Sequence, residues 1–138
     1  MAMTPNKVCP VVLRQGSSAR EVLVFQHPLA GRQLVKGSIE DGEAIEAAAL
    51  RELSEETGIR EARVVRHLGA WASGFQGQVW AFVLCEPRVT LVDSWVHHVE
   101  DDGGHDFQFF WQPLFEPVND QEWHPLFQNA LAFIRTAV

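Results

Sequence analysis

Residues 37–59 read GSIEDGEAIEAAALRELSEETGI, and their pattern is the most informative in this chain of 138 residues. We predict a helix over residues 43–57, entered through Asp41-Gly42 and ended by Gly58. On a helical wheel the apolar residues of this segment gather on one side. The face next to that side turns from alkyl to carboxylate in the second half of the helix.

Three glutamates, Glu52, Glu55 and Glu56, form this carboxylate face at positions i, i+3 and i+4. A purely solvated face would not border the core, and like charges at these spacings repel. Negative charge in the last helical turn also opposes the helix dipole, at a cost of roughly 0.3–1 kcal/mol. A bound divalent cation would reverse these penalties, because Mg²⁺ takes carboxylate oxygens as ligands. The residues alone therefore favour a metal site over a solvated face.

The net charge of −7 is unevenly distributed along the chain. Residues 1–36 are net positive, whereas residues 37–59 and 93–106 form two acidic clusters. Acidic clusters beside a basic segment suggest a hard divalent cation with an anionic ligand. We expect no duplex nucleic acid as partner, because no broad basic face is evident. We also expect no membrane, because the apolar runs are far below the roughly 18 residues of a spanning helix.

The length and a hydrophobic fraction of 46% predict one globular domain over residues 1–138. Strands are expected over residues 7–14, 20–26, 33–36, 63–70, 78–86 and 107–112, and a final helix from about residue 120 or 124 to 135. Strands before, between and after two helices predict an α/β sandwich with a mixed sheet. Cys9 and Cys85 lie in apolar contexts and are expected to be buried thiols in a reducing, cytoplasmic compartment.

Residues 37–59 resemble the Nudix box. In that motif a glycine is followed after five residues by glutamate, and after seven more by Arg-Glu, an aliphatic residue, any residue, Glu-Glu, any residue, glycine and an aliphatic residue. Every fixed position is matched here, with Leu53 and Ile59 at the aliphatic positions. The resemblance to MutT-like Nudix hydrolases implies an α/β/α sandwich with a central mixed β-sheet. It also implies hydrolysis of a phosphoanhydride (pyrophosphate) bond in a nucleoside diphosphate linked to another moiety, X, with Mg²⁺ or Mn²⁺ as cofactor.

The resemblance carries site roles over to this chain by position. It implies these metal ligands: Glu52, Glu55, Glu56 and the carbonyl of Gly37. Glu100, in the acidic segment 100–106, is favoured by resemblance as one more ligand. Candidate catalytic residues are Glu52, Glu55 and Arg51, with Arg51 orienting a carboxylate of the box through a charge-assisted hydrogen bond. The general base is left open between Glu52, Glu55 and an acid of residues 100–106.

Several side chains outside the carboxylate face are candidates for binding the substrate. Cationic candidates for a phosphate contact are Lys36, Arg32, Arg14 and Arg20. Lys36 is the best of them because it directly precedes Gly37. Trp71 and Phe75 flank a glycine-containing turn and are candidates for stacking on a nucleobase. Each of these also has an ordinary alternative, a solvated surface cation or a core aromatic side chain.

Two other functions are weighed against hydrolysis. The same fold could serve as a nucleotide-sensing module that binds without turnover, although the intact glutamate set argues against this. It could also be an isoprenoid diphosphate isomerase, which would need a cysteine and a glutamate in the pocket. The contexts of Cys9 and Cys85 do not support that interpretation. The sequence leaves open which nucleotide or X is recognised, which phosphorus is attacked, and whether the chain forms a homodimer.

Overall fold

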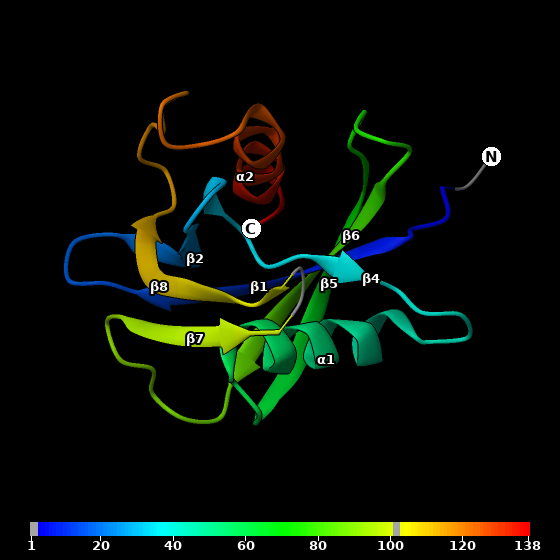
Figure 1. The fold of residues 1–138 in the computed structure, drawn as a ribbon, viewed down its shortest axis with the longest axis horizontal. Helices are drawn as coiled ribbons and strands as arrows, with labels where there is room; N and C mark the ends of the chain where they lie inside the picture. The colour runs from blue at the N-terminus through cyan, green and yellow to red at the C-terminus, as the bar shows by residue number, and fades with distance from the viewer. Residues whose placement is uncertain (1–2, 101–102) are drawn as a thin grey trace.

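A computed structural model describes residues 3–100 and 103–138, and in them the chain forms a mixed sheet flanked by helices (Figure 1). The elements in chain order are β1 (Lys7–Gln15), β2 (Arg20–His27), β3 (Gly31–Gln33), β4 (Gly37–Ser38), α1 (Ile45–Thr57), β5 (Ala62–Ala72), β6 (Val79–Pro87), β7 (Trp95–Val99), β8 (His105–Pro113) and α2 (Pro125–Ala137). The strand order is β5-β6-β1-β2-β8-β7, with β3 paired to β2 and β4 paired to β1. The pairing of β1 with β6 is parallel, and the other pairings are antiparallel.

The two helices cover opposite faces of the sheet (Figure 1). Because side chains of a strand alternate between faces, β1 contributes to both cores. Val8 and Val12 pack on the side of α1 with Leu53, whereas Cys9 and Val11 pack on the side of α2. This arrangement confirms the predicted α/β/α sandwich with a central mixed sheet. Among the residues described, no helix has the length and apolar content of a membrane span.

Strand β1 is shared between two neighbours along one of its edges. Near its start, Lys7 pairs with Ser38 and Val8 with Gly37 of β4, while β6 occupies the opposite edge. Near its end, residues 13–15 pair with β2 instead. The short strand β4 therefore seats the beginning of the Nudix box against the sheet, immediately before the chain leads into α1.

The predicted helices are present with small differences at their ends. Helix α1 begins at Ile45, two residues later than predicted, and its C-cap Gly58 has the left-handed φ of 82° that favours glycine. Helix α2 begins at Pro125, and its N-cap His124 accepts a hydrogen bond from the backbone N–H of Leu126 at 3.0 Å. Pro125 occupies the first helical turn, where its missing N–H costs nothing.

The prediction of a single strand over residues 33–36 is wrong. The structure instead has β3 and β4 on either side of Leu34 and Val35, which are buried in different cores. The break follows from a change of partner, because β3 pairs with β2 and β4 pairs with β1. Strand β7, which pairs with β8, is an element that the sequence reading missed.

Candidate active site

The carboxylate of Glu52 lies against the backbone of Gly37. A Cβ atom built on Gly37 would lie 1.9 Å from Cδ of Glu52 and 2.1 and 2.2 Å from its two oxygens. The Glu52 side chain is only 10% exposed, which agrees with its predicted position beside the apolar side of α1. Glycine is required at position 37 because any larger residue would occupy the place of this carboxylate.

Arg51 links the loop, β4 and α1 through its guanidinium group. Its Nε and Nη2 atoms donate to the two carboxylate oxygens of Glu43, at 2.7 and 2.9 Å. Its Nη1 atom donates to Glu52 at 2.8 Å and to Glu55 at 3.2 Å. Its Nη2 atom also donates to the carbonyl oxygen of Ser38, at 2.9 Å. This planar fork holds three carboxylates at fixed positions relative to β4.

The Arg51–Glu43 pair is the strongest electrostatic feature of this network. Hydrogen bonds from Arg51 are the main cause that lowers the pKa of Glu43 to about 2, and the backbone N–H of Glu40 adds to the effect. The same pairing raises the pKa of Arg51. Glu43 is therefore ionised at every physiological pH, and it fixes the guanidinium that in turn contacts Glu52 and Glu55.

The last turn of α1, which carries Glu55 and Glu56, is anchored to β7. The indole Nε1 of Trp95 donates to the carbonyl oxygen of Thr57 at 2.9 Å, and Nε2 of His97 lies 3.0 Å from the carbonyl oxygen of Glu55. These contacts occupy carbonyl groups that lack partners within the helix. The sequence analysis did not assign this anchoring role, because WVHHV lacks the regular alternation of apolar and polar residues that would have indicated the strand.

The predicted metal ligands are only partly gathered in this structure. Glu52 and Glu55 meet at Arg51, and Glu56 is half-buried on the same helix. Glu100 is 92% exposed, and its carboxylate lies 3.3 Å from Nε2 of His98. Across residues 3–100 and 103–138, no three His, Cys, Asp or Glu side chains converge as a metal-binding group. The other acids of segment 100–106 include residues 101 and 102, which lie outside the described residues.

Lys36 lies beside the box, on the α2 side of the sheet. Its Nζ atom is 5.1 Å from the ring centre of Trp80 and 5.8 Å from that of Phe127, and it donates to Oε1 of Gln78 at 3.3 Å. Burial, followed by the nearby charge of Lys7, lowers the pKa of Lys36. Of the predicted phosphate contacts, this one is next to Gly37 in the sequence.

Two of the other predicted cations, Arg32 and Arg14, are held by carboxylates elsewhere. Arg32 pairs with Glu122 at 2.6 Å, and its guanidinium lies 5.0 Å from the ring centre of Phe110. Arg14 pairs with Glu21 at 2.8 Å and lies over the ring of Trp111. Both guanidinium groups thus have their charge compensated within the protein. Arg20 is exposed at the start of β2.

The predicted stacking residues lie on the α2 side. Trp71 packs edge-on against Trp80, with ring centres 5.3 Å apart, and contacts Phe133 at 6.5 Å. Phe75 is half-buried and meets the ring of His124 at 6.2 Å. Trp71 therefore contributes to the core beneath α2, whereas Phe75 lies in the turn between β5 and β6 and contacts the N-cap of α2.

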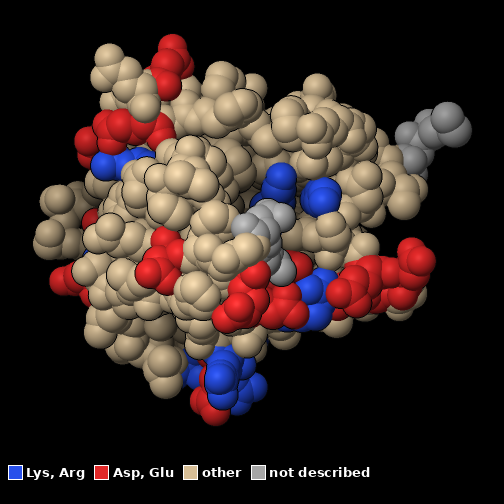
Figure 2. Space-filling model, viewed as in Figure 1, with Lys and Arg blue, Asp and Glu red and all other residues tan. Residues whose placement is uncertain are grey.

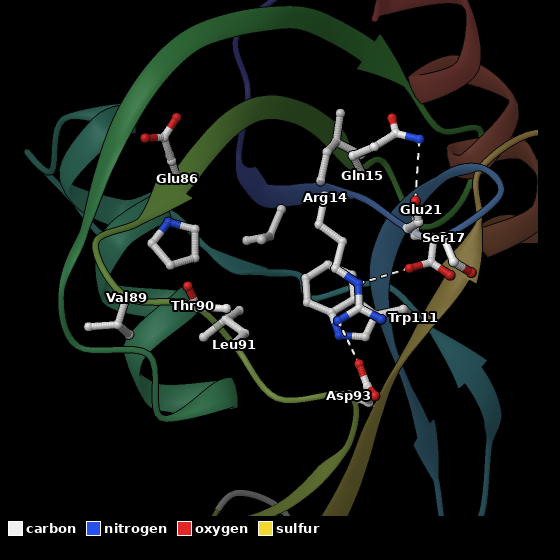
Figure 3. Close-up of a pocket in the computed structure, with 14 residues that line it drawn as sticks. Arg14, Gln15, Ser17, Glu21, Glu86, Val89, Thr90, Leu91, Asp93 and Trp111 are labelled. Carbon is white, nitrogen blue, oxygen red and sulfur yellow. Dashed lines mark hydrogen bonds and ion pairs between the residues drawn. The ribbon is translucent and has the colours of Figure 1, made fainter.

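Two hollows of about 620 Å³ flank residues 88–94 on the α1 side of the sheet, and no glutamate of the carboxylate face lines either of them. Thr57, Gly58 and Ile59, at the end of the box, line one of the two. Figure 3 shows one of them, where Arg14 crosses the face of Trp111 and reaches both Glu21 and Asp93. The remaining carboxylate of that hollow, Glu86, pairs with Arg63 at 3.3 Å. Its charges are thus compensated internally.

The chain belongs to the NUDIX domain family, whose model matches residues 4–129. This match confirms the family predicted from the box and the predicted class of enzyme, a Nudix pyrophosphohydrolase. Nudix hydrolases generally use divalent metal ions. A comparison with curated proteins finds no significant match.

Solved structures confirm the fold at low sequence identity. An ADP-ribose pyrophosphatase from Streptococcus suis is 14% identical, with 98% of this chain and 94% of that chain covered and a TM-score of 0.64. A C. elegans Ap4A hydrolase is 18% identical, with 97% and 98% covered and a TM-score of 0.62. The NUDIX domain of Shewanella oneidensis NrtR, complexed with ADP ribose, is 16% identical, with 99% and 89% covered and a TM-score of 0.55.

Proposed function

We propose that the chain hydrolyses a phosphoanhydride bond in a nucleoside diphosphate linked to another moiety, X, with Mg²⁺ as cofactor and Mn²⁺ as a substitute. The observation that carries the proposal is the burial of the Glu52 carboxylate against Gly37, at the edge of an acidic helix face. Carboxylate and carbonyl oxygens are the ligands that a hard divalent cation prefers. The absence of a side chain on Gly37 leaves room for that donor set, so the residues fit such an ion.

The ligands of this proposal are Glu52, Glu55, Glu56, Glu100 and the carbonyl of Gly37. When bound, the ion neutralises phosphate oxygens and lowers the pKa of a water molecule. Arg51 orients Glu52 and Glu55 through charge-assisted hydrogen bonds, and Glu43 holds Arg51 from its other side. Figure 2 shows the resulting band of acidic side chains over α1 and the loop before it, with basic side chains beside it.

A carboxylate must also take the proton of the attacking water. Of the two candidates in the box, Glu55 is the more accessible, with a side chain 58% exposed against 10% for Glu52. We therefore propose Glu55 as the base of the box, with an acid of segment 100–106 as the alternative. For substrate binding we propose that Lys36 contacts a phosphate group and that Phe75 lies beside the nucleobase of the substrate.

The isomerase interpretation loses support from the position of the thiols. Cys9 and Cys85 are buried and unbonded, and they face opposite sides of the sheet. Burial raises the pKa of Cys85 to about 12 and also raises the pKa of Cys9. Neither thiol is placed to exchange protons with a substrate. Reduced, buried cysteines accord with the cytoplasmic location that we include in the proposal.

The test is turnover of a nucleotide panel with Mg²⁺ or Mn²⁺: nucleoside triphosphates, ADP-ribose, dinucleoside polyphosphates, sugar nucleotides, NADH and coenzyme A. We expect metal-dependent turnover that is lost in Glu55→Gln and in Glu56→Gln, with the unfolding temperature unchanged or slightly raised without metal. Glu46→Gln is the matched control, because this α1 carboxylate contacts His67 instead. Equal turnover in the wild type and both variants would contradict the ligand roles. Stabilisation by nucleotides without any turnover would support a sensing module instead.

A further inference from the structure

We propose that Lys7 and Lys36, the only two lysines of the chain, together bind the phosphate chain of a substrate with three or more phosphates. This inference rests on the proposed function and narrows its substrate to nucleotides with a triphosphate or longer chain. The inference excludes diphosphates that are esterified at both ends, such as sugar nucleotides, as the preferred substrates.

Both lysines lie on the α2 side of the sheet, at the strand that carries Gly37. Lys7 shares this side with Cys9 because side chains of β1 alternate, and its Nζ atom donates to Oγ of Ser38 at 2.6 Å. Lys36 directly precedes β4, and its ammonium lies over the rings of the α2 core. The backbone of Gly37 thus meets Glu52 on one side and the two lysines flank it on the other.

Neither lysine has a carboxylate partner among the described residues. This is unusual in a chain with 18 acidic and 11 basic residues. Of its four half-buried arginines, three are ion-paired (Arg14, Arg32 and Arg51), and the fourth, Arg135, donates to two backbone carbonyls. Lys36 is half-buried, and its ammonium contacts the neutral oxygen of Gln78 and the rings of Trp80 and Phe127. A half-buried ammonium without a counter-charge is costly. An anion held between the lysines would supply the missing partner.

The amount of charge defines the class of anion. Each internal phosphate of a nucleotide carries about one negative charge, and a terminal phosphate carries up to about two. A diphosphate esterified at both ends is therefore neutralised by a single divalent cation at the carboxylates, which leaves no charge for two lysines. A nucleoside triphosphate, or a dinucleoside with four phosphates, has about two charges left over, which matches the lysine pair.

The test measures binding apart from turnover. Tripolyphosphate and dimethyl diphosphate, the second esterified at both ends, are titrated without metal into the Glu55→Gln/Glu56→Gln protein, in which turnover is expected to be lost. We expect tighter binding of tripolyphosphate, weakened about tenfold or more by Lys7→Met and by Lys36→Met, since each removes a charged hydrogen-bond donor. Arg20→Met removes the same charge at the far end of the β1–β2 hairpin and is expected to change the affinity less than about twofold.

Equal affinity for the two probes, or an equal loss in Arg20→Met, would overturn the inference. The unfolding temperature of each variant shows that it is folded. Turnover of diphosphates such as ADP-ribose, without turnover of triphosphates or dinucleoside polyphosphates, would also overturn the inference while leaving the proposed function intact. Selective tripolyphosphate binding without turnover of any nucleotide would support the lysine site and would contradict the proposed hydrolysis.

Discussion

Replacing Gly37 by alanine moves one carboxylate and changes little else. The new Cβ would lie 1.9 Å from Cδ of Glu52, whereas carbon atoms in contact sit about 3.5 Å apart or more. The carboxylate must therefore retreat by about 1.6 Å or turn away. The atoms in its path belong to the end of a flexible side chain, so the backbone can keep its place. We expect Gly37→Ala to disturb the site much more than the fold.

The expected loss follows from that displacement. A misplacement of about 1 Å in a catalytic group can cost about 100-fold in rate. We therefore expect Gly37→Ala to lower kcat by about 100-fold or more with saturating Mg²⁺, and to change the free energy of unfolding by less than about 1 kcal/mol. Steady-state kinetics on the best substrate of the panel and urea unfolding provide the two measurements.

A double-mutant cycle of Gly37→Ala and Glu52→Ala tests whether the two residues act together. If Gly37→Ala acts by displacing Glu52, adding Glu52→Ala should cause little further loss, because the displaced group no longer contributes. Losses that multiply would mean that the two residues act independently. Wild-type turnover in Gly37→Ala would show that the buried position of Glu52 is not needed for chemistry, and the proposed ligand set would fail with it.

Two further predictions concern the frame around the carboxylates. The pKa of Glu43 is held near 2 rather than at its ordinary 4.5, so this group contributes stability above about pH 4.5 that is lost as the pH falls toward 2. Arg51→Met should therefore flatten the decline in unfolding free energy over that window, and an unchanged pH profile would contradict the pairing. Trp95→Phe keeps the stack on Phe109 but removes the hydrogen bond to Thr57, and should lower the unfolding free energy by about 1 kcal/mol in urea titrations. An unchanged unfolding free energy would mean that this anchor does not hold the end of α1.

Local patterns carried the prediction of α1 and of the carboxylate face. The end of the helix at Gly58 and the position of Glu52 beside the apolar side of α1 follow from spacing within one short segment, whereas the exposure of Glu55 was not predicted. Strand β8 was equally readable, because Phe107, Phe109 and Trp111 occupy every second position. Such features depend on neighbours in sequence, and periodicity records them directly.

Features that depend on pairing between distant segments were not readable. The split of residues 33–36 arises because two different strands accept that stretch, which no local pattern encodes. Strand β7 is only five residues long and carries adjacent histidines, so its alternation was weak against an acidic neighbourhood. The partnership of Lys7 with the box needed the register between β1 and β4. Its only signal in the sequence was the rarity of lysine.

The carboxylates lie in one continuous segment, whereas the proposed phosphate-binding groups come from separate strands, and this difference affects how the fold selects its substrate. The box provides the carboxylates and the fork of Arg51 within one continuous segment, so these parts can persist while the rest of the chain changes. Solved structures share the sandwich at 14–18% identity, and the names of two of these proteins contain ADP-ribose and Ap4A respectively. The groups beyond the box in this chain, Lys7 on β1 and Gln78 before β6, come from strands that only the tertiary fold brings to Lys36. Selectivity should therefore follow residues of the sheet rather than of the box, and changes at positions 7 and 78 should alter KM between substrates more than kcat.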